Sequence, residues 1–297
     1  MKILISGASG LVGAAVAQSL TNDHHEIIRL VRRAPRSREE IEWNPDANKL
    51  DASGLNHIEA VVHLAGESIA SGRWNREKKA RIRDSRVKGT RLLSETLANL
   101  SQPPRVLVSA SAIGYYGDRG DEVLTEESAE GRGFLAEVCR EWEAATGAAQ
   151  ERGVRVTMMR FGMILSERGG ALTKMMPPFK MGVGGRIGSG QQFISSVALD
   201  DVVGAIIHAI GTESLTGAIN MVAPNPVTNE EFTRVLGRVL SRPTIFPLPA
   251  FAARLAFGEM ADELLLSSAR VEPRRLLESG YRFRYADLES ALRSMLG

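Results

Sequence analysis

The feature that most restricts the fold of this chain lies at residues 2–13, where the apolar run KILIS leads into GASGLVG. The glycines are spaced three apart between a predicted strand and a predicted helix. In such a turn the first glycine permits the sharp bend, the second lets the backbone approach an anion, and the third lets the helix lie close to the sheet. The free N–H groups of the helix then favour a phosphate, although an ordinary glycine-rich turn is an alternative. The residues assigned to this dinucleotide site are Gly7, Ser9, Gly10, Leu11, Val12 and Gly13.

Short apolar runs alternate with longer helical patterns along the first 220 residues. The runs at 2–6, 26–31, 60–65, 105–110, 154–161 and 218–222 predict strands. Helical periodicity covers 11–20, 76–100, 134–150 and 200–210. This alternation predicts an α/β protein with a Rossmann-like, doubly wound parallel sheet and a smaller C-terminal lobe.

The residue composition of the chain changes after residue 165. Residues 169–192 are rich in glycine and proline, which predicts a long loop. The last fifty or so residues read as helices around a short strand, YRFRY. We therefore divide the chain into a cofactor-binding domain, 1–168 plus 193–222, and a C-terminal substrate-side lobe, 169–192 plus 223–297.

The composition excludes several classes of protein. The chain is 43% hydrophobic and 24% charged, and its 37 basic and 35 acidic residues leave a net charge of +2. This near balance argues against a partner that is nucleic acid or a membrane surface, and the apolar runs are too short to span a bilayer. The single cysteine, Cys139, fits a reducing compartment, so a cytoplasmic protein without a metal site is expected. A small-molecule substrate is the expected partner, and the chain itself is a monomer or a homodimer.

The end of the second predicted strand indicates which dinucleotide binds. A site for NAD(H) places a carboxylate here to bond the ribose 2′-hydroxyl. This chain has Arg32 and Arg33 instead, and the first carboxylate is Glu39. An arginine can bind a 2′-phosphate with its planar fork. NADP(H) is therefore predicted in preference to NAD(H), with Arg32 the better placed of the two arginines.

These residues resemble the short-chain dehydrogenase/reductase superfamily in its extended form, the NAD(P)-dependent epimerase/dehydratases. The chain is most similar to an uncharacterised epimerase subgroup that has a separate C-terminal module. The similarity runs from ISGASGLVG through VVHLAGESIASGRW, RIRDSRVKGT, SASAIGYYGD, FLAEVCREWE and MRFGMIL to the tail. It implies a fold and a cofactor, but membership of a fold family does not name a substrate.

The resemblance also implies roles for individual residues. The predicted strand at 60–65 ends over the cofactor at Leu64, Ala65, Gly66 and Glu67, where Glu67 either bonds the adenosine ribose or lies at the pocket mouth. Further residues beside the cofactor are Ser109, Arg160 and Gly162. Ser111 fits the family's substrate-binding serine. Arg73 and Arg86 lie near the cleft, where they would bind an acidic group of the substrate.

The superfamily's Tyr-x-x-x-Lys pair is absent from the helix that should carry it. The tyrosine position falls on Phe134 or Leu135, and the lysine position falls on Val138 or Cys139. Without a nearby cation a tyrosine keeps a pKa near 10. Tyr115 or Tyr116 is the predicted substitute, with Arg160 or a cofactor hydroxyl as electrostatic partner. For Tyr116 the alternative is a ring packed on the cofactor, whose hydroxyl bonds to backbone. Weaker alternatives are Cys139 as nucleophile and Asp118 or Glu137 as base.

Two functions follow from this pattern. The first is an NADP(H)-dependent oxidoreductase or epimerase, with Ser111, Tyr116 and Tyr115 as catalytic residues, acting on a small, anionic or sugar-like substrate. The second is an NADP(H)-binding sensor or regulatory protein that transfers no hydride, which the missing Tyr-x-x-x-Lys pair suggests.

Overall fold

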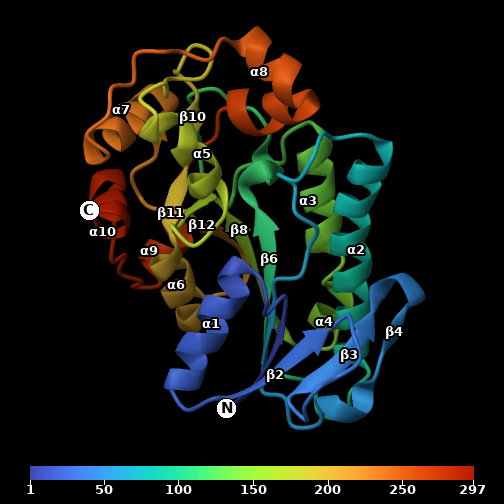
Figure 1. Ribbon diagram of the computed structural model, residues 1–297. Coiled ribbons are helices and arrows are strands. Elements are labelled where there is room, and N and C mark those ends of the chain that lie inside the picture. Colours follow the sequence, from blue (N-terminus) through green and yellow to red (C-terminus); the bar gives the residue numbers. More distant parts are fainter.

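The computed structural model describes residues 1–297, and its centre is one eight-stranded sheet (Figure 1). The strand order is β12-β8-β6-β5-β1-β2-β3-β4, and all neighbours are parallel except β3 and β4. This sheet confirms the predicted doubly wound α/β class. The strands are β1 Lys2–Ser6, β2 Glu26–Val31, β3 Glu40–Asn44, β4 Lys49–Leu50, β5 Ala60–His63, β6 Val106–Ala112, β8 Arg155–Phe161 and β12 Gly217–Met221.

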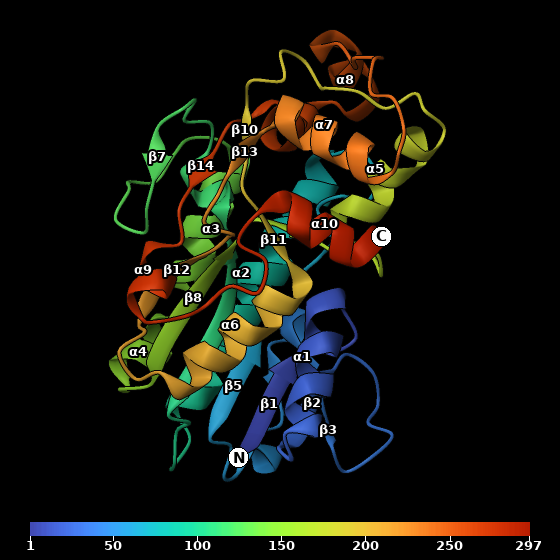
Figure 2. The same cartoon turned by 90° about the vertical axis from the view of Figure 1, so that its left-hand side faces the viewer.

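Helices cover both faces of the sheet (Figures 1 and 2). One face packs against α1 (Leu11–Asn22) and α6 (Leu199–Gly211), and the other against α2 (Arg76–Ala98), α3 (Phe134–Ala144) and α4 (Gly147–Glu151). Along β1, Ile3 and Ile5 belong to the first core and Leu4 to the second. A parallel strand that is buried on both sides is mostly apolar, which is why Ile3, Leu4 and Ile5 form an unbroken apolar run in KILIS.

Most of the C-terminal lobe, with α5 (Ala171–Lys180), α7 (Asn229–Val239) and α8 (Ala250–Phe257), lies beyond the carboxyl ends of the strands, whereas α9 (Arg274–Glu278) lies beside β12 (Figure 2). The core of the lobe is formed mainly by α5, α7 and α10 (Leu288–Leu296). No helix of the protein has both the length and the apolar character needed to cross a membrane. The remaining elements are η1 Pro45–Ala47, η2 Ala52–Leu55, η3 Ile113–Tyr116, β7 Val123–Leu124, β9 Met163–Leu165, β10 Phe193–Ile194, β11 Ser196–Ala198, β13 Val227–Thr228, η4 Ala261–Leu266 and β14 Arg270–Val271.

Three predictions of local structure were wrong. Residues 169–192 are not one long loop, because α5 forms within them and buries Leu172, Met176 and Phe179 despite two internal prolines. The predicted strand YRFRY does not form. The predicted helix over 134–150 is two helices, α3 and α4. The sequence reading also missed β3 and β4. The division into two domains stays a prediction.

The YRFRY segment does not form a strand because its backbone donors bond to Asp201, which is distant in sequence. Its carboxylate accepts hydrogen bonds from the backbone N–H groups of Arg284, at 2.6 Å, and Tyr285, at 3.0 Å. These two donors are therefore not available to a neighbouring strand. Asp201 lies in the first turn of α6, so its carboxylate anchors the C-terminal segment to this helix.

A buried hydrogen-bond chain around His63, at the end of β5, joins the sheet to α2 and α3. His63 Nδ1 lies 2.6 Å from Ser6 Oγ, and Nε2 lies 2.9 Å from Thr90 Oγ1. Trp142 Nε1 donates to the same Thr90 oxygen at 2.9 Å. Burial lowers the pKa of His63 to about 4, so the imidazole is neutral at neutral pH.

We predict that His63 makes the protein acid-sensitive. Its pKa is lower in the folded state than in the unfolded chain, so the unfolded state takes up the proton first as the pH falls. The stability present above pH 6.5 is then lost towards pH 4, by about 3 kcal/mol in total for this shift. Urea unfolding at a series of pH values measures this slope. His63→Gln should flatten it, whereas His57→Gln, at an exposed turn, should not.

Candidate functional site

The turn between β1 and α1 approaches the end of β5 so closely that only glycine fits at position 7. Gly7 has a φ of +72°, in the left-handed region. A Cβ there would lie 2.8 Å from the carbonyl carbon and oxygen of Leu64 and 2.9 Å from Ala65 N. Both the backbone conformation and the lack of space therefore require glycine.

The other two glycines leave the N-terminal N–H groups of α1 without side chains over them. A Cβ on Gly13 would lie 2.2 Å from the Gly7 carbonyl oxygen, so this glycine lets the helix pack directly on the turn. Gly10 is the N-cap residue of α1 and supplies no capping side chain. The first N–H groups of the helix, at Leu11 and Val12, thus keep their capacity to bind an anion. The turn from Gly7 to Gly10 and the first residues of α1, Leu11 to Gly13, are called the cradle below. The cradle fits the pyrophosphate of a dinucleotide.

The two arginines after β2 differ in their surroundings. Arg33 donates to both carboxylate oxygens of Glu40, at 2.8 and 2.6 Å. This pair lowers the pKa of Glu40 to about 2. Arg32 is exposed and has no hydrogen bond or ion pair. The geometry therefore favours Arg32, and not Arg33, as the arginine available to a 2′-phosphate.

The segment after β5 is held on helix α2 through Glu67. The Glu67 N–H donates to Ser85 Oγ, and its carbonyl oxygen accepts from Arg86 Nη1, both at 3.0 Å. Its carboxylate accepts from Lys78 Nζ at 2.6 Å, and this hydrogen bond lowers the pKa of Glu67. Of the two alternatives for Glu67, a carboxylate paired with Lys78 fits a place at the pocket mouth better than a ribose ligand.

The two arginines predicted to bind substrate differ in their partners: Arg86 bonds to backbone of the protein, and Arg73 has no partner. Arg86 donates to the carbonyl oxygens of Glu67 and Ile82, and its guanidinium lies 5.0 Å from the centre of the Trp142 ring. It therefore holds the segment after β5 in place. Arg73 is exposed, has no hydrogen bond, and lies beside Gly258 of the C-terminal lobe. Only Arg73 is free to bind an acidic group.

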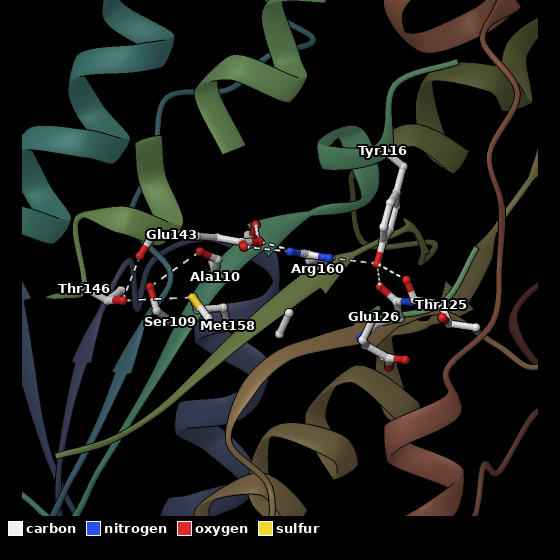
Figure 3. Close-up of polar contacts among 12 residues, drawn as sticks. Ser109, Ala110, Tyr116, Thr125, Glu126, Glu143, Thr146, Met158 and Arg160 are labelled. Carbon is white, nitrogen blue, oxygen red and sulfur yellow. Dashed lines mark hydrogen bonds and ion pairs between the residues drawn. The ribbon is translucent and has the colours of Figure 1, made fainter. Parts of the chain in front are cut away.

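A buried ion pair joins the ends of β6, β8 and helix α3 (Figure 3). Arg160 Nε and Nη2 each donate to one carboxylate oxygen of Glu143, at 2.8 Å. Ser111 Oγ donates to the same carboxylate at 2.7 Å. The third nitrogen of Arg160 donates to the Tyr116 hydroxyl at 2.9 Å. The Ser111 proton is thus committed to Glu143, and the side chain is only 2% exposed, so contact with a ligand stays a prediction for Ser111.

Tyr116 belongs to this network and has no exposed surface. Its hydroxyl lies 2.7 Å from Asn220 Oδ1 and 3.0 Å from the Thr125 carbonyl oxygen, the two acceptors for its one proton. Burial raises the pKa of Tyr116. The structure therefore favours the alternative in which Tyr116 is a packed ring, and it disfavours proton transfer by Tyr116.

Tyr115 is the tyrosine that remains available. It is half-buried, and its hydroxyl has no hydrogen-bond partner within the protein. Its ring centre lies 3.5 Å from the guanidinium carbon of Arg160, close enough for a cation–π interaction. The structure thus brings together Ser111, Tyr115 and Arg160, as the sequence predicted, and it adds Glu143.

Three residues predicted to contact the cofactor are instead in close contact with other parts of the protein. Ser109 is 1% exposed and Arg160 is 4% exposed. At Gly162 a Cβ would lie 2.3 Å from the Ser195 carbonyl oxygen, so the close approach of the β11 segment explains this glycine. These three residues shape the end of the sheet, and direct contact with a cofactor stays a prediction for them.

The place of the missing Tyr-x-x-x-Lys pair is apolar and covered. Cys139 is buried, and burial raises the pKa of its thiol to about 12, which argues against a nucleophilic role. The N–H groups of Phe134 and Leu135 donate to the carboxylate of Glu263, at 3.0 and 3.3 Å. Helix α3 is therefore capped by a side chain of the C-terminal lobe.

Of the two alternative bases, Glu137 is exposed on α3 and has only a long ion pair with Arg83, at 3.9 Å. Asp118 accepts from the Ser268 N–H at 3.1 Å, so it holds two loops together. Sequence reasoning missed Glu143, Lys78 and Glu263. Glu143 lies within the predicted helix 134–150, but its partners Ser111 and Arg160 come from two strands, so no local pattern reveals it.

We predict that Gly13→Ala disrupts the cradle. The new Cβ must displace backbone, which destabilises the fold by about 1–3 kcal/mol and weakens NADPH binding because the helix start moves. Urea unfolding and fluorescence titration with NADPH measure the two effects. Gly147→Ala is the control, since a Cβ there meets nothing within 4 Å. Equal behaviour of the two variants would contradict the prediction.

We also predict that the two neighbouring tyrosines respond differently to loss of the hydroxyl. Tyr116→Phe leaves buried groups of Arg160 and Asn220 without a partner, which destabilises the protein by about 1–3 kcal/mol. Tyr115→Phe removes a hydroxyl without an internal partner and should change stability by less than about 0.5 kcal/mol. Urea unfolding distinguishes them, and a larger effect at Tyr115 would refute this assignment.

Two family models match the chain. Residues 3–221 match the NAD dependent epimerase/dehydratase family, and residues 248–295, from before α8 to α10, match a domain of unknown function, DUF1731. The epimerase family protein Mb2239 of Mycobacterium bovis is 43% identical over 98% of this chain and 96% of its own length. The human epimerase family protein SDR39U1 is 33% identical over the full length of both.

Solved structures agree with this assignment. The human SDR39U1 structure, determined with NADPH, has a TM-score of 0.92 and 32% identity, and the match covers 100% of this chain and 99% of that one. A nucleoside-diphosphate sugar epimerase from Corynebacterium glutamicum has a TM-score of 0.83 and 38% identity over 58% of its chain. The similarity to the short-chain dehydrogenase/reductase superfamily is thereby confirmed, and the chain belongs to the NAD-dependent epimerase/dehydratase family.

Proposed function

We propose that this protein is an NADP(H)-dependent oxidoreductase or epimerase that acts on a small, sugar-like or anionic molecule. The observation that carries the proposal is the cradle at Gly7. Its backbone has a left-handed φ and no space for a side chain, so that only glycine can form it. The relative solved with NADPH supports the choice of cofactor, as does the free guanidinium of Arg32. NADP(H) is thus preferred to NAD(H), and a cytoplasmic monomer or homodimer remains the prediction from sequence.

The chain's own residues would hold the cofactor in an extended manner across the sheet edge. The N–H groups of Leu11, Val12 and Gly13 bind the pyrophosphate, with Ser9 exposed beside them. The backbone of Leu64, Ala65 and Gly66 lines the adenosine ribose. When bound, NADP(H) supplies or accepts the hydride.

Tyr115 is the proposed acid and base. Its hydroxyl has no partner within the protein, and its ring lies over the Arg160 guanidinium, which holds the side chain at the end of β8. It would exchange a proton with the reacting oxygen of the substrate. Ser111, which donates to Glu143, would accept a hydrogen bond from a substrate hydroxyl. Tyr116 supports this site from the core.

The proposed substrate class rests on two observations. Arg73 is an exposed, unpaired cation between the loop after β5 and the C-terminal lobe, so it suits a phosphate or carboxylate. A relative at 38% identity is a nucleoside-diphosphate sugar epimerase. A sugar nucleotide combines both features, a hydroxylated ring and an anionic group.

The second candidate function is an NADP(H)-binding sensor that transfers no hydride. It is favoured by the apolar, covered surface at Phe134, Leu135 and Cys139, where the proton-transfer pair of related enzymes would lie. In this case Tyr115 would serve only to line the cofactor pocket.

We predict that Tyr115→Phe lowers kcat by a factor of about 10²–10⁴ while NADPH binding is retained. The assay offers aldehydes, ketones and nucleoside-diphosphate sugars with NADP(H), and follows cofactor absorbance and the sugar product by chromatography. Val123→Ala, at an exposed site on β7, is the control. Wild-type protein that binds NADPH yet turns over none of these compounds would support the sensor, and an unchanged rate for Tyr115→Phe would exclude Tyr115 as acid.

A further inference from the structure

Glu67 is fixed at three separate atoms by residues of helix α2. Ser85 accepts from its N–H, Arg86 donates to its carbonyl oxygen, and Lys78 donates to its carboxylate. With both backbone groups and the side chain held, the carboxylate cannot turn to another partner without breaking the contact with Lys78. No sequence motif assigns a role to Lys78.

Lys78 is an unusual partner because its ammonium is buried. Its side chain is 5% exposed, against 33% for Glu67. Besides Glu67, it donates to Ser71 Oγ at 2.7 Å. A buried ammonium is costly unless it is paired, so Glu67 and Lys78 depend on each other. The carboxylate, in contrast, keeps one side towards solvent.

The sheet register places this pair near the unpaired arginine after β2. Leu30 pairs with Ser6, and Ser6 pairs with His63, so β2 and β5 end on either side of the Gly7 turn. With strands about 4.8 Å apart, the backbone of Arg32 lies roughly 10 Å from the start of the segment after β5. A guanidinium on its long side chain reaches across much of this distance.

A second free arginine lies on the same side. Arg81 is one turn after Lys78 on α2, is exposed, and has no hydrogen bond or ion pair. After Lys78, the charges of Arg81 and Arg32 also contribute to lowering the pKa of Glu67. Three cations thus surround one carboxylate beside the cradle, and two of these cations have no partner.

We propose that Lys78 is a cofactor-specificity residue, which neutralises Glu67 so that Arg32 and Arg81 can accept the 2′-phosphate of NADP(H). The inference rests on the proposed function. In Rossmann sites a carboxylate beside the adenosine ribose serves NAD(H), because it bonds the 2′-hydroxyl. That carboxylate usually follows the second strand, whereas Glu67 follows β5, but its negative charge beside Arg32 and Arg81 would equally repel a 2′-phosphate. Pairing with Lys78 removes both effects. The discrimination between the cofactors therefore depends on a residue that contacts neither of them.

The test is the dissociation constant for NADPH and for NADH, measured by the fluorescence of the reduced nicotinamide and independent of any turnover. Lys78→Met releases Glu67 while keeping the length of the side chain. NADPH should bind about tenfold more weakly, and NADH should change by less than about twofold or bind more tightly. Lys88→Met is the matched control, since Lys88 also pairs with a carboxylate, Asp84, on the surface of the same helix.

The double variant Lys78→Met with Glu67→Gln removes both charges and should restore NADPH binding to within about threefold of the wild type. Glu67→Gln alone does not depend on the folding of the Lys78 variant; it should strengthen NADPH binding more than NADH binding. The proposal is overturned if Lys78→Met weakens both cofactors equally or neither, or if Glu67→Gln weakens NADPH selectively. Wild-type protein that binds neither cofactor would instead overturn the proposed function.

Discussion

The ion pair between Glu143 and Arg160 is the interaction on which the site depends. Its side chains are 11% and 4% exposed, and both carboxylate oxygens are bonded to the guanidinium. Removing one member of such a pair typically costs about 3–5 kcal/mol, because the other charge stays buried. Through this pair the ends of β6 and β8 are fixed to helix α3. The orientation of Ser111, the burial of Tyr116 and the cation under Tyr115 all follow from it.

In the proposed function this pair also takes the place of the usual lysine. In related enzymes a cation on the helix lies beside the tyrosine, whereas here the helix supplies an anion, Glu143, and the strand β8 supplies the cation, Arg160. Tyr115 lies above that cation on the short helix η3, before α3 in the chain. The cation nearest the ring thus comes from the sheet and not from the helix. A second paired charge, Lys78 with Glu67, joins the segment after β5 to helix α2.

The parts of the fold that could be predicted are those in which one local signal decides the structure. The parallel strands are continuous apolar runs, and β1 and β2 have the predicted bounds. The strand β3, EIEWN, was missed because only Ile41 and Trp43 are apolar, so it lacks the continuous apolar run of the other parallel strands. Helix α5 was missed because Pro177 and Pro178 indicate a loop, yet its apolar face is buried in the C-terminal lobe. The YRFRY strand failed because a distant carboxylate, Asp201, takes its backbone donors.

The sequence by itself determined the α/β class, the position of the dinucleotide cradle and the absence of a Tyr-x-x-x-Lys pair, because each depends on residue types at fixed spacing. Only the tertiary structure decided which side chains are free to act. Arg32 and Arg33 are adjacent in sequence, but Glu40 occupies only Arg33. Tyr115 and Tyr116 are also adjacent, but one hydroxyl is free and the other is bound in the core. Such distinctions depend on partners from other strands and helices, which are brought together only when the chain folds.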